Sequence, residues 1–267
     1  MQTLRKALEQ SEANRLAIGH FNISDLTILK AVFEAARDRN VPVIVGASEG
    51  ERQFVGDRQL FALVSSLRDE YDFPIFLNAD HTHSLASVLK AANAGFDWIV
   101  FDVSTLPLNE NICQTKAAVE AVKAIRPDIL VEGEIGDIGS GSEIHDAVPD
   151  LKKGLTTPAE AKRFVEETGV DTLAPAVGNM HGMLKSMVAG DTRKHLDIER
   201  IRAIKAEAPM FMTLHGASGT DDEDLRQAIA AGITVVHINT EVRLVWRRGL
   251  DAALANHPDE IDRKSVV

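Results

Sequence analysis

The sequence contains a single cysteine, which excludes an internal disulfide bond and a zinc site built from cysteines. Cys113 has no second thiol with which to form an internal disulfide, and a zinc site made of cysteine ligands is excluded as well. Because Cys113 falls inside a predicted helix over residues 111–125, we interpret it as a buried structural thiol.

Long apolar runs and basic stripes are also missing. No apolar stretch approaches the roughly 20 residues that a membrane-spanning helix needs. Lys and Arg number 29 against 40 Asp and Glu, a net charge of −11, and no basic stripe is visible, which argues against a nucleic-acid partner. The first ten residues have the pattern of an amphipathic helix rather than a signal peptide. We therefore expect a cytoplasmic protein that binds neither membranes nor nucleic acid.

The common nucleotide-binding fingerprints are absent too. The first predicted βα turn carries no G-x-G-x-x-G and the chain has no Walker P-loop, which weakens a doubly wound open sheet as the alternative fold. What the chain has is eight apolar strands that alternate with eight helices, without an internal linker. A length of 267 residues, 45% of them hydrophobic, suits one large barrel. We therefore predict a single α/β domain over residues 1–267 with the (β/α)8 TIM-barrel fold. The predicted strands cover residues 16–22, 42–48, 74–80, 97–102, 129–134, 170–177, 210–214 and 234–239.

The third predicted strand ends in an unusual group of polar residues. Its apolar run is followed at once by Asp80 and His81, at the carboxyl end where α/β barrels place their chemistry. Adjacent strand residues point to opposite sides, so we expect Asp80 and His81 to point apart and to do different jobs. The simpler alternative is a helix cap, with Asp80 or Ser84 opening the next helix and the histidine as a polar loop residue.

Three histidines follow predicted strands at the same end of the barrel. They are His81, His181 and His215, and three imidazoles with an open fourth position form a catalytic zinc arrangement. Glu134, at the end of the fifth strand, is an extra or alternate ligand. The alternative is three separate hydrogen-bonded loop histidines. Other strands also end in polar residues: Asn22, Ser48, Asp102, and Asn239 with Thr240. We interpret His20, inside the first strand, as a hydrogen-bonded core histidine, and Arg243 as part of a solvated helix face.

Two glycine-containing loops have the composition of phosphate sites. One is Gly178–Gly182, followed by Lys185, and the other runs over residues 214–219 and contains Gly216 and Ser218. Glycines let backbone N–H groups approach an anion, and barrels often bind phosphate after their last strands. For either loop alone, a tight turn without a ligand is the alternative.

Taken together, these motifs resemble the class II, metal-dependent fructose-bisphosphate aldolases and their tagatose-bisphosphate relatives. The motifs that carry the resemblance are Gly-His-Phe-Asn22, Asp80-His81, Val-Glu-Gly-Glu134-Ile-Gly, Gly-Asn-Met-His181-Gly, Leu-His215-Gly-Ala-Ser and Ile-Asn-Thr-Glu241. They span nearly the whole chain, and their combination is specific although each one alone is weak.

The resemblance implies an activity and a set of roles. It implies reversible cleavage of a ketose bisphosphate, first of all fructose 1,6-bisphosphate, to dihydroxyacetone phosphate and glyceraldehyde 3-phosphate, by a homodimer or homotetramer. The implied metal ligands are His81, His181 and His215 for a catalytic Zn²⁺, with Glu134 and Asp102 at secondary or alternate metal positions. Asp80 would exchange the proton of the C4 hydroxyl. The implied phosphate contacts are Gly182, Lys185, Gly216, Ser218 and Thr240, a monovalent cation (Na⁺ or K⁺) would sit near these loops, and Asn22 and Ser48 would face the substrate.

The chain also departs from the family pattern at three places. His237 stands where the family has a substrate-contacting asparagine, with Asn239 one inward-facing step further along the strand. Glu143 is the candidate for the carboxylate that takes a proton from the dihydroxyacetone-phosphate carbon, although Ser142 is the direct match. Arg263 is the nearest match to the arginine for the second phosphate. These departures leave two alternatives: an aldolase for another sugar phosphate, such as tagatose 1,6-bisphosphate or a monophosphate, or a non-catalytic barrel that binds metal and sugar phosphate.

Overall fold

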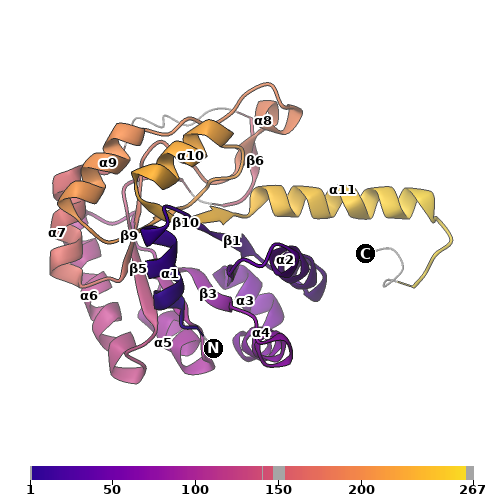
Figure 1. The fold of residues 1–267 in the computed structure, drawn as a ribbon, viewed down its shortest axis with the longest axis horizontal. Helices are drawn as coiled ribbons and strands as arrows, with labels where there is room; N and C mark the ends of the chain where they lie inside the picture. Colours follow the sequence, from indigo (N-terminus) through magenta and orange to yellow (C-terminus); the bar gives the residue numbers. More distant parts are fainter. Residues whose placement is uncertain (1, 140, 147–153, 263–267) are drawn as a thin grey trace.

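The architecture is a closed barrel of eight parallel strands, in a computed structural model that describes residues 2–139, 141–146 and 154–262. The barrel strands are β1 (Ile18–Asn22), β2 (Val43–Ala47), β3 (Ile75–Thr82), β4 (Trp98–Phe101), β5 (Leu130–Ile135), β7 (Thr172–Pro175), β9 (Phe211–Leu214) and β10 (Ile233–Ile238). They follow one another around the barrel in chain order, and β10 closes it against β1 (Figure 1). The predicted TIM barrel is confirmed, and the open-sheet alternative is excluded.

Helices cover the outside of the barrel. They are α2 (Leu26–Asp38), α4 (Asp57–Tyr71), α5 (Leu85–Ala94), α6 (Leu108–Ile125), α7 (Pro158–Thr168), α9 (Ile198–Glu207) and α10 (Asp222–Ala231). Helix α7 begins at Pro158, where Thr157 and Glu160 form a capping box and proline suits the first turn. The N-cap of α2 is Asp25, whose carboxylate accepts the Ile28 N–H at 2.9 Å.

The two largest apolar cores lie on either side of the strands. The larger lies between the strands and the outer helices. The smaller fills the barrel interior, where Phe76 and Trp98 pack against Leu4 and Leu8 of α1 (Leu4–Ala13). Helix α1 therefore plugs the barrel at the amino ends of the strands. At the opposite end, polar residues such as Asp80, His81 and His215 lie at the carboxyl ends of the strands.

Several short elements in the βα loops were not predicted. They are α3 (Glu49–Val55), α8 (Lys185–Ala189), and the two-residue strands β6 (Ile144–His145) and β8 (Met183–Leu184), which pair in parallel. Helix α3 is held by a capping box between Ser48 and Glu51 and has too few apolar residues to show a helical period. These elements shape the loops above the carboxyl ends of the strands.

The last helix, α11 (Thr240–Asn256), runs away from the barrel (Figure 1). Of its side chains only Thr240 is buried, and Val245 is 68% exposed. An apolar groove between α11 and α2 is lined by residues that include Ala31, Val32, Val242 and Trp246.

The helices bear on two expectations, the absence of a membrane-spanning segment and the burial of Cys113. None of the described helices is long and apolar enough to cross a membrane. Cys113 is exposed, so the prediction of a buried thiol is wrong. The reason is its position on α6: the buried face contains the neighbours Asn111, Ile112 and Thr115, and Cys113 lies off that face.

Candidate active site

A polar cavity of about 290 Å³ opens at the carboxyl ends of the strands. Most of the predicted site residues line it: Asn22, Ser48, Asp80, His81, Asp102, His181, Gly182, His215, Gly216, Ser218, His237, Asn239 and Thr240. They come from loops far apart in the chain, and the closed barrel is what brings them together.

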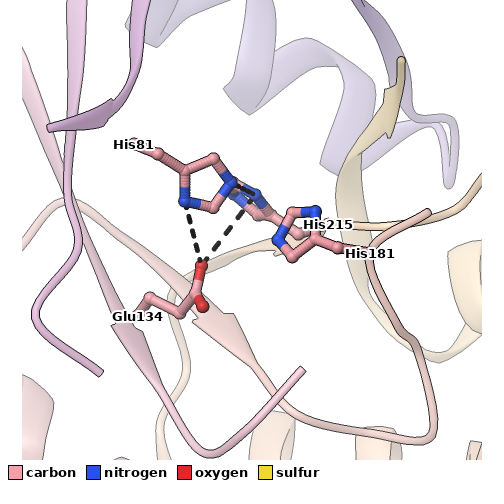
Figure 2. A group of neighbouring side chains, drawn as sticks. All are labelled: His81, Glu134, His181 and His215. Atoms are coloured by element: carbon pink, nitrogen blue, oxygen red, sulfur yellow. Dashed lines mark hydrogen bonds and ion pairs between the residues drawn. The ribbon is translucent and has the colours of Figure 1, made fainter. Parts of the chain in front are cut away.

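The three predicted ligand histidines meet at one point of this cavity. His81 Nε2 and His215 Nδ1 lie 3.1 Å apart, and the His181 ring centroid is 4.7 Å from that of His81. The Glu134 carboxylate approaches from β5, with Oε2 3.8 Å from His81 Nδ1 and 4.0 Å from His215 Nδ1. Figure 2 shows the three rings and this carboxylate facing a common centre.

Two of the histidines are held in orientation by carboxylates, one half-buried and one buried, on their other ring nitrogens. His81 Nδ1 lies 2.9 Å from Asp102 Oδ2, and His215 Nε2 lies 2.7 Å from Glu132 Oε1. Glu132 also accepts hydrogen bonds from the hydroxyls of Thr172, at 2.7 Å, and Thr213. Second carboxylates of this kind fix the tautomer and raise the basicity of a metal-binding imidazole. His81 is thus left with Nε2 and His215 with Nδ1 facing the centre.

Asp102 and Glu132 therefore each contact one of the predicted ligand histidines. Asp102, predicted at a secondary metal position, lies outside the group of four residues around the common centre. Glu132 was not singled out from the sequence. The available signal was its spacing of two from Glu134, which places both side chains on the inner face of β5.

The backbone at the end of β3 overturns one expectation. Asp80 and His81 do not point apart: both line the cavity, and Asp80 Oδ1 lies 3.8 Å from His81 Nε2. The pairing with β4 shifts register between Ala79 and Thr82, and His81 has a φ of 43°. A left-handed residue breaks the alternation of side chains along the strand, and such backbone strain is concentrated at functional sites.

Asp80 is buried and ionised. Its Oδ2 accepts a hydrogen bond from Asn22 Nδ2 at 2.9 Å, and its Oδ1 lies 3.6 Å from His237 Nδ1. Burial by itself would raise the pKa of Asp80, but the positive charge of His81 and the contact with His237 outweigh it and hold that pKa well below the usual range. A carboxylate is therefore kept as a proton acceptor beside the histidine cluster.

The pKa values of the four residues around the common centre favour protonation of two of them at neutral pH. Burial would lower the pKa of His81, but Asp80, Asp102 and Glu134 raise it to about 10. Burial and the charge of Asp102 raise the pKa of Glu134 to about 8. Burial and the neighbouring His81 and His215 push the pKa of His181 well below its usual value. A divalent cation at this centre would replace those protons.

The donor set fits a zinc ion. Three imidazole nitrogens and a carboxylate oxygen are ligands that Zn²⁺ takes, and two ligand atoms at ~2.1 Å in a tetrahedron lie about 3.4 Å apart. The 3.1 Å between His81 Nε2 and His215 Nδ1 is close to that separation. Glu134 Oε2 is buried and has no hydrogen-bond partner among the described residues, as expected for an atom that faces a cation.

Comparison with known proteins agrees with this geometry. The family model described as "Fructose-bisphosphate aldolase class-II" matches residues 2–267. The chain belongs to the class II fructose-bisphosphate aldolase family. Among solved structures, it resembles the YdjI aldolase from Escherichia coli K12, with 28% identity, a TM-score of 0.79, and coverage of 98% of this chain and 89% of that one. A putative fructose-1,6-bisphosphate aldolase from Coccidioides immitis has 27% identity, a TM-score of 0.77, and coverage of 97% and 86%.

A third structure supports the fold alone. The fructose-bisphosphate aldolase of Campylobacter jejuni is 20% identical, with a TM-score of 0.75 over 96% of this chain and 80% of that one. Membership of the family identifies the chain as an aldolase, a carbon–carbon lyase, and His81, Glu134, His181 and His215 form a group that could hold a metal ion.

Several predicted residues of this aldolase lie elsewhere. Lys185 is exposed, and its ammonium contacts Asp146 Oδ1 at 2.6 Å. Glu143 is exposed, whereas the neighbouring Ser142 lines the cavity and accepts a hydrogen bond from Asn239 Nδ2 at 2.9 Å. Arg263 lies outside the described residues.

Arg243 is exposed, as expected of a residue on a solvated helix face. It also lines the cavity and pairs with Glu51 Oε1 at 2.5 Å, which the sequence did not indicate. Helix α11 borders the cavity from its first residue, Thr240. Glu51, in turn, accepts a hydrogen bond from Asn22 Nδ2 at 3.0 Å.

His237 belongs to a stacked histidine pair under the cavity floor. Its ring lies parallel to that of His20, with centroids 3.5 Å apart, and 4.0 Å from that of His215. His20 is fully buried, and its Nε2 lies 3.0 Å from Asn78 Oδ1, which confirms the hydrogen-bonded core histidine. Burial lowers the pKa of both His20 and His237, so two neutral rings stack without charge repulsion. A Cβ at Gly46 would lie 2.1 Å from His20 Nε2, so only glycine leaves room for this ring.

Proposed function

We propose that this aldolase is zinc-dependent and reversibly cleaves a ketose bisphosphate, fructose 1,6-bisphosphate first, to dihydroxyacetone phosphate and glyceraldehyde 3-phosphate. The observation that carries the proposal is the ionised Asp80 carboxylate beside three converging histidines, with Asp80 Oδ1 3.8 Å from His81 Nε2. Aldol cleavage needs these two parts: a base for a hydroxyl proton and an electron sink for the charge left on carbon.

The zinc ion would be held by His81 through Nε2, His215 through Nδ1, and His181, with Glu134 as the fourth or alternate ligand. Bound there, zinc supplies a Lewis acid that stabilises negative charge next to the substrate carbonyl. Asp102 and Glu132 keep the two imidazoles in the tautomers that this requires. A lysine Schiff base is not part of the proposal.

Asp80 would take the proton of the C4 hydroxyl during cleavage and return it during condensation. Its low pKa keeps it ionised, Asn22 donates a hydrogen bond to its Oδ2, and His237 Nδ1 lies 3.6 Å from its Oδ1. A positioned base of this kind contributes about 10²–10⁴-fold to rate. Ser142, on the cavity wall, stands where the second proton-transfer carboxylate was expected, and Glu143 keeps that role only as a prediction.

The phosphate of the dihydroxyacetone-phosphate half would bind where two glycine loops and the start of α11 meet. Gly182, Gly216 and Ser218 line this wall, and α11 begins there at Thr240. Backbone N–H groups and a helix N-terminus attract an anion, which the net charge of −11 would otherwise repel. Arg243 supplies a cation on the cavity wall for a second phosphate. The Na⁺ or K⁺ ion expected near these loops stays a prediction; the same loops hold the ammonium of Lys194.

A second candidate function is aldol cleavage of another sugar phosphate, such as tagatose 1,6-bisphosphate or a monophosphate. The observation that favours it is His237, which lines the cavity and contacts Asp80 in place of the family's asparagine. The non-catalytic alternative predicts ligand binding without cleavage.

The substrate proposal is tested with a panel of ketose mono- and bisphosphates and an enzyme-coupled assay for dihydroxyacetone phosphate. The first proposal predicts the highest kcat/KM for fructose 1,6-bisphosphate in the parent protein. Preference for another member of the panel that His237→Asn moves back to fructose 1,6-bisphosphate would favour the second candidate. Tight binding without any cleavage would contradict both.

We also propose a cytoplasmic homodimer or homotetramer whose small-molecule partner is a sugar phosphate. Helix α11 leaves an apolar groove against α2 and presents Val245, 68% exposed, to solvent. An apolar surface of this kind marks an interface. Light scattering on the parent protein and on Val245→Asp tests it: the parent is expected above monomer mass and the variant closer to it. A monomeric parent protein would contradict the proposal.

A further inference from the structure

Behind the phosphate-binding wall lies a buried lysine that the reaction does not use. Lys194 is 1% exposed, and its ammonium donates to three backbone carbonyl oxygens: Met180 at 2.8 Å, Gly182 at 2.6 Å and Gly216 at 2.9 Å. Met180 and Gly182 flank the ligand His181, and Gly216 follows the ligand His215. One ammonium therefore ties together the two segments that carry these histidines.

The backbone around Lys194 holds it rigidly in this place. Its N–H donates to the Gly219 carbonyl at 2.8 Å, and its own carbonyl accepts the Asp221 N–H at 3.0 Å. Gly216 has a φ of +59°, and a Cβ there would lie 2.3 Å from the Met180 carbonyl oxygen. The close approach of the two loops, which brings the carbonyls to one point, therefore requires glycine.

Three converging carbonyl oxygens are the kind of ligand set that holds a Na⁺ or K⁺ ion in proteins. Here all three accept from one ammonium, whose three N–H groups match them one to one. Burial lowers the pKa of Lys194 to about 7, while the nearby Glu241 raises it. A neutral amine could donate only two hydrogens, so the observed contacts are those of the charged form.

We propose that the Lys194 ammonium is a built-in cation that replaces a monovalent metal ion in this carbonyl cradle, fixes the segments of His181 and His215, and makes the protein independent of Na⁺ and K⁺. Lys194 is a positioning residue, because it acts on the metal-binding histidines through the loop backbone. The proposal rests on the histidine cluster as a metal site and on no particular substrate.

The test compares Lys194→Ala, which empties the cradle, with Lys194→Met, which fills it with an apolar chain of similar length. Lys162→Ala, on an exposed lysine paired with Glu207, is the control for loss of one charge. Thermal unfolding and zinc affinity are measured in chlorides of K⁺, NH₄⁺ and the bulky tetramethylammonium, at equal ionic strength.

The parent protein and Lys162→Ala are expected to unfold at the same temperature, within about 1 °C, in all three salts. Lys194→Ala is expected to gain about 3 °C in K⁺ or NH₄⁺ over tetramethylammonium, since a small ion can occupy the cradle. Its zinc affinity is expected to fall at least tenfold in tetramethylammonium and to recover in NH₄⁺. Lys194→Met is expected to lose zinc affinity to the same extent and not to recover it in K⁺ or NH₄⁺.

A parent protein whose unfolding temperature or zinc affinity depends on K⁺ would overturn the proposal, and this result needs no variant. So would a Lys194→Ala protein that responds equally to K⁺, NH₄⁺ and tetramethylammonium, or a Lys194→Met protein that is rescued like Lys194→Ala. Because no substrate enters these measurements, they separate the fate of this proposal from that of the aldolase activity.

Discussion

The substitution Glu132→Gln tests whether a buried carboxylate outside the metal centre sets the metal affinity. Glu132 is fully buried and accepts from His215 Nε2 at 2.7 Å, while hydroxyls of Thr172 and Thr213 donate to its other oxygen. Glutamine keeps the volume and one acceptor, but it loses the negative charge that raises the pKa of His215. It also presents an NH₂ group, which cannot accept, to one side of the site.

The expected result is a zinc affinity 10–100-fold weaker than that of the parent protein, about 1.4–2.7 kcal/mol. Competition with a chromophoric chelator at neutral pH measures it, and circular dichroism verifies the fold. Glu167→Gln is a matched control, because it removes the same charge from an exposed pair with Arg163. If a folded Glu132→Gln protein bound zinc within about twofold of the parent, the role assigned to Glu132 would be refuted.

Two further predictions concern protons at the same site. Asp80→Asn is expected to bind zinc like the parent protein and to lose about 10²–10⁴-fold in kcat, because the amide cannot accept the hydroxyl proton; parent-level turnover would show that another group is the base. Zinc binding must displace the proton of His81, whose pKa in the metal-free protein is about 10. Affinity therefore rises with pH up to that value, about tenfold per unit from this proton alone. Chelator titrations at several pH values that give a flat profile would contradict this.

The barrel and most of the cavity residues were predictable from the sequence for a physical reason. Parallel strands buried on both faces appear as apolar runs, so the first polar residue after each run marks a carboxyl end. The closed barrel then requires these ends to share one rim. Asp80, His81, His181 and His215 were found this way, and the cavity brings them together.

What the sequence did not reveal depends on tertiary geometry. The direction of the Asp80 side chain relative to that of His81 is set by the left-handed backbone of His81 at a register shift. Histidine has no strong preference for this conformation, so the sequence does not predict it. Glu132 shares the inner face of β5 with Glu134, but its contact with His215 depends on how β5 and the loop after β9 meet in the barrel. The apolar positions of α11 fit a helix packed on the barrel as well as one that leaves it. Lys194 lies in a loop, and its ammonium donates to backbone carbonyls, which no side-chain pattern encodes.

The measurement that tests the central claim most directly is cleavage of fructose 1,6-bisphosphate by chelator-stripped protein, before and after zinc is added. The account predicts that cleavage disappears with the metal and returns with zinc, and that His81→Ala, which lacks one ligand, does not recover at the same zinc concentration. Cleavage that continues at the parent rate in fully stripped protein would contradict a metal-dependent aldolase. Zinc binding without cleavage of any ketose phosphate would contradict the catalytic role and leave a binding barrel.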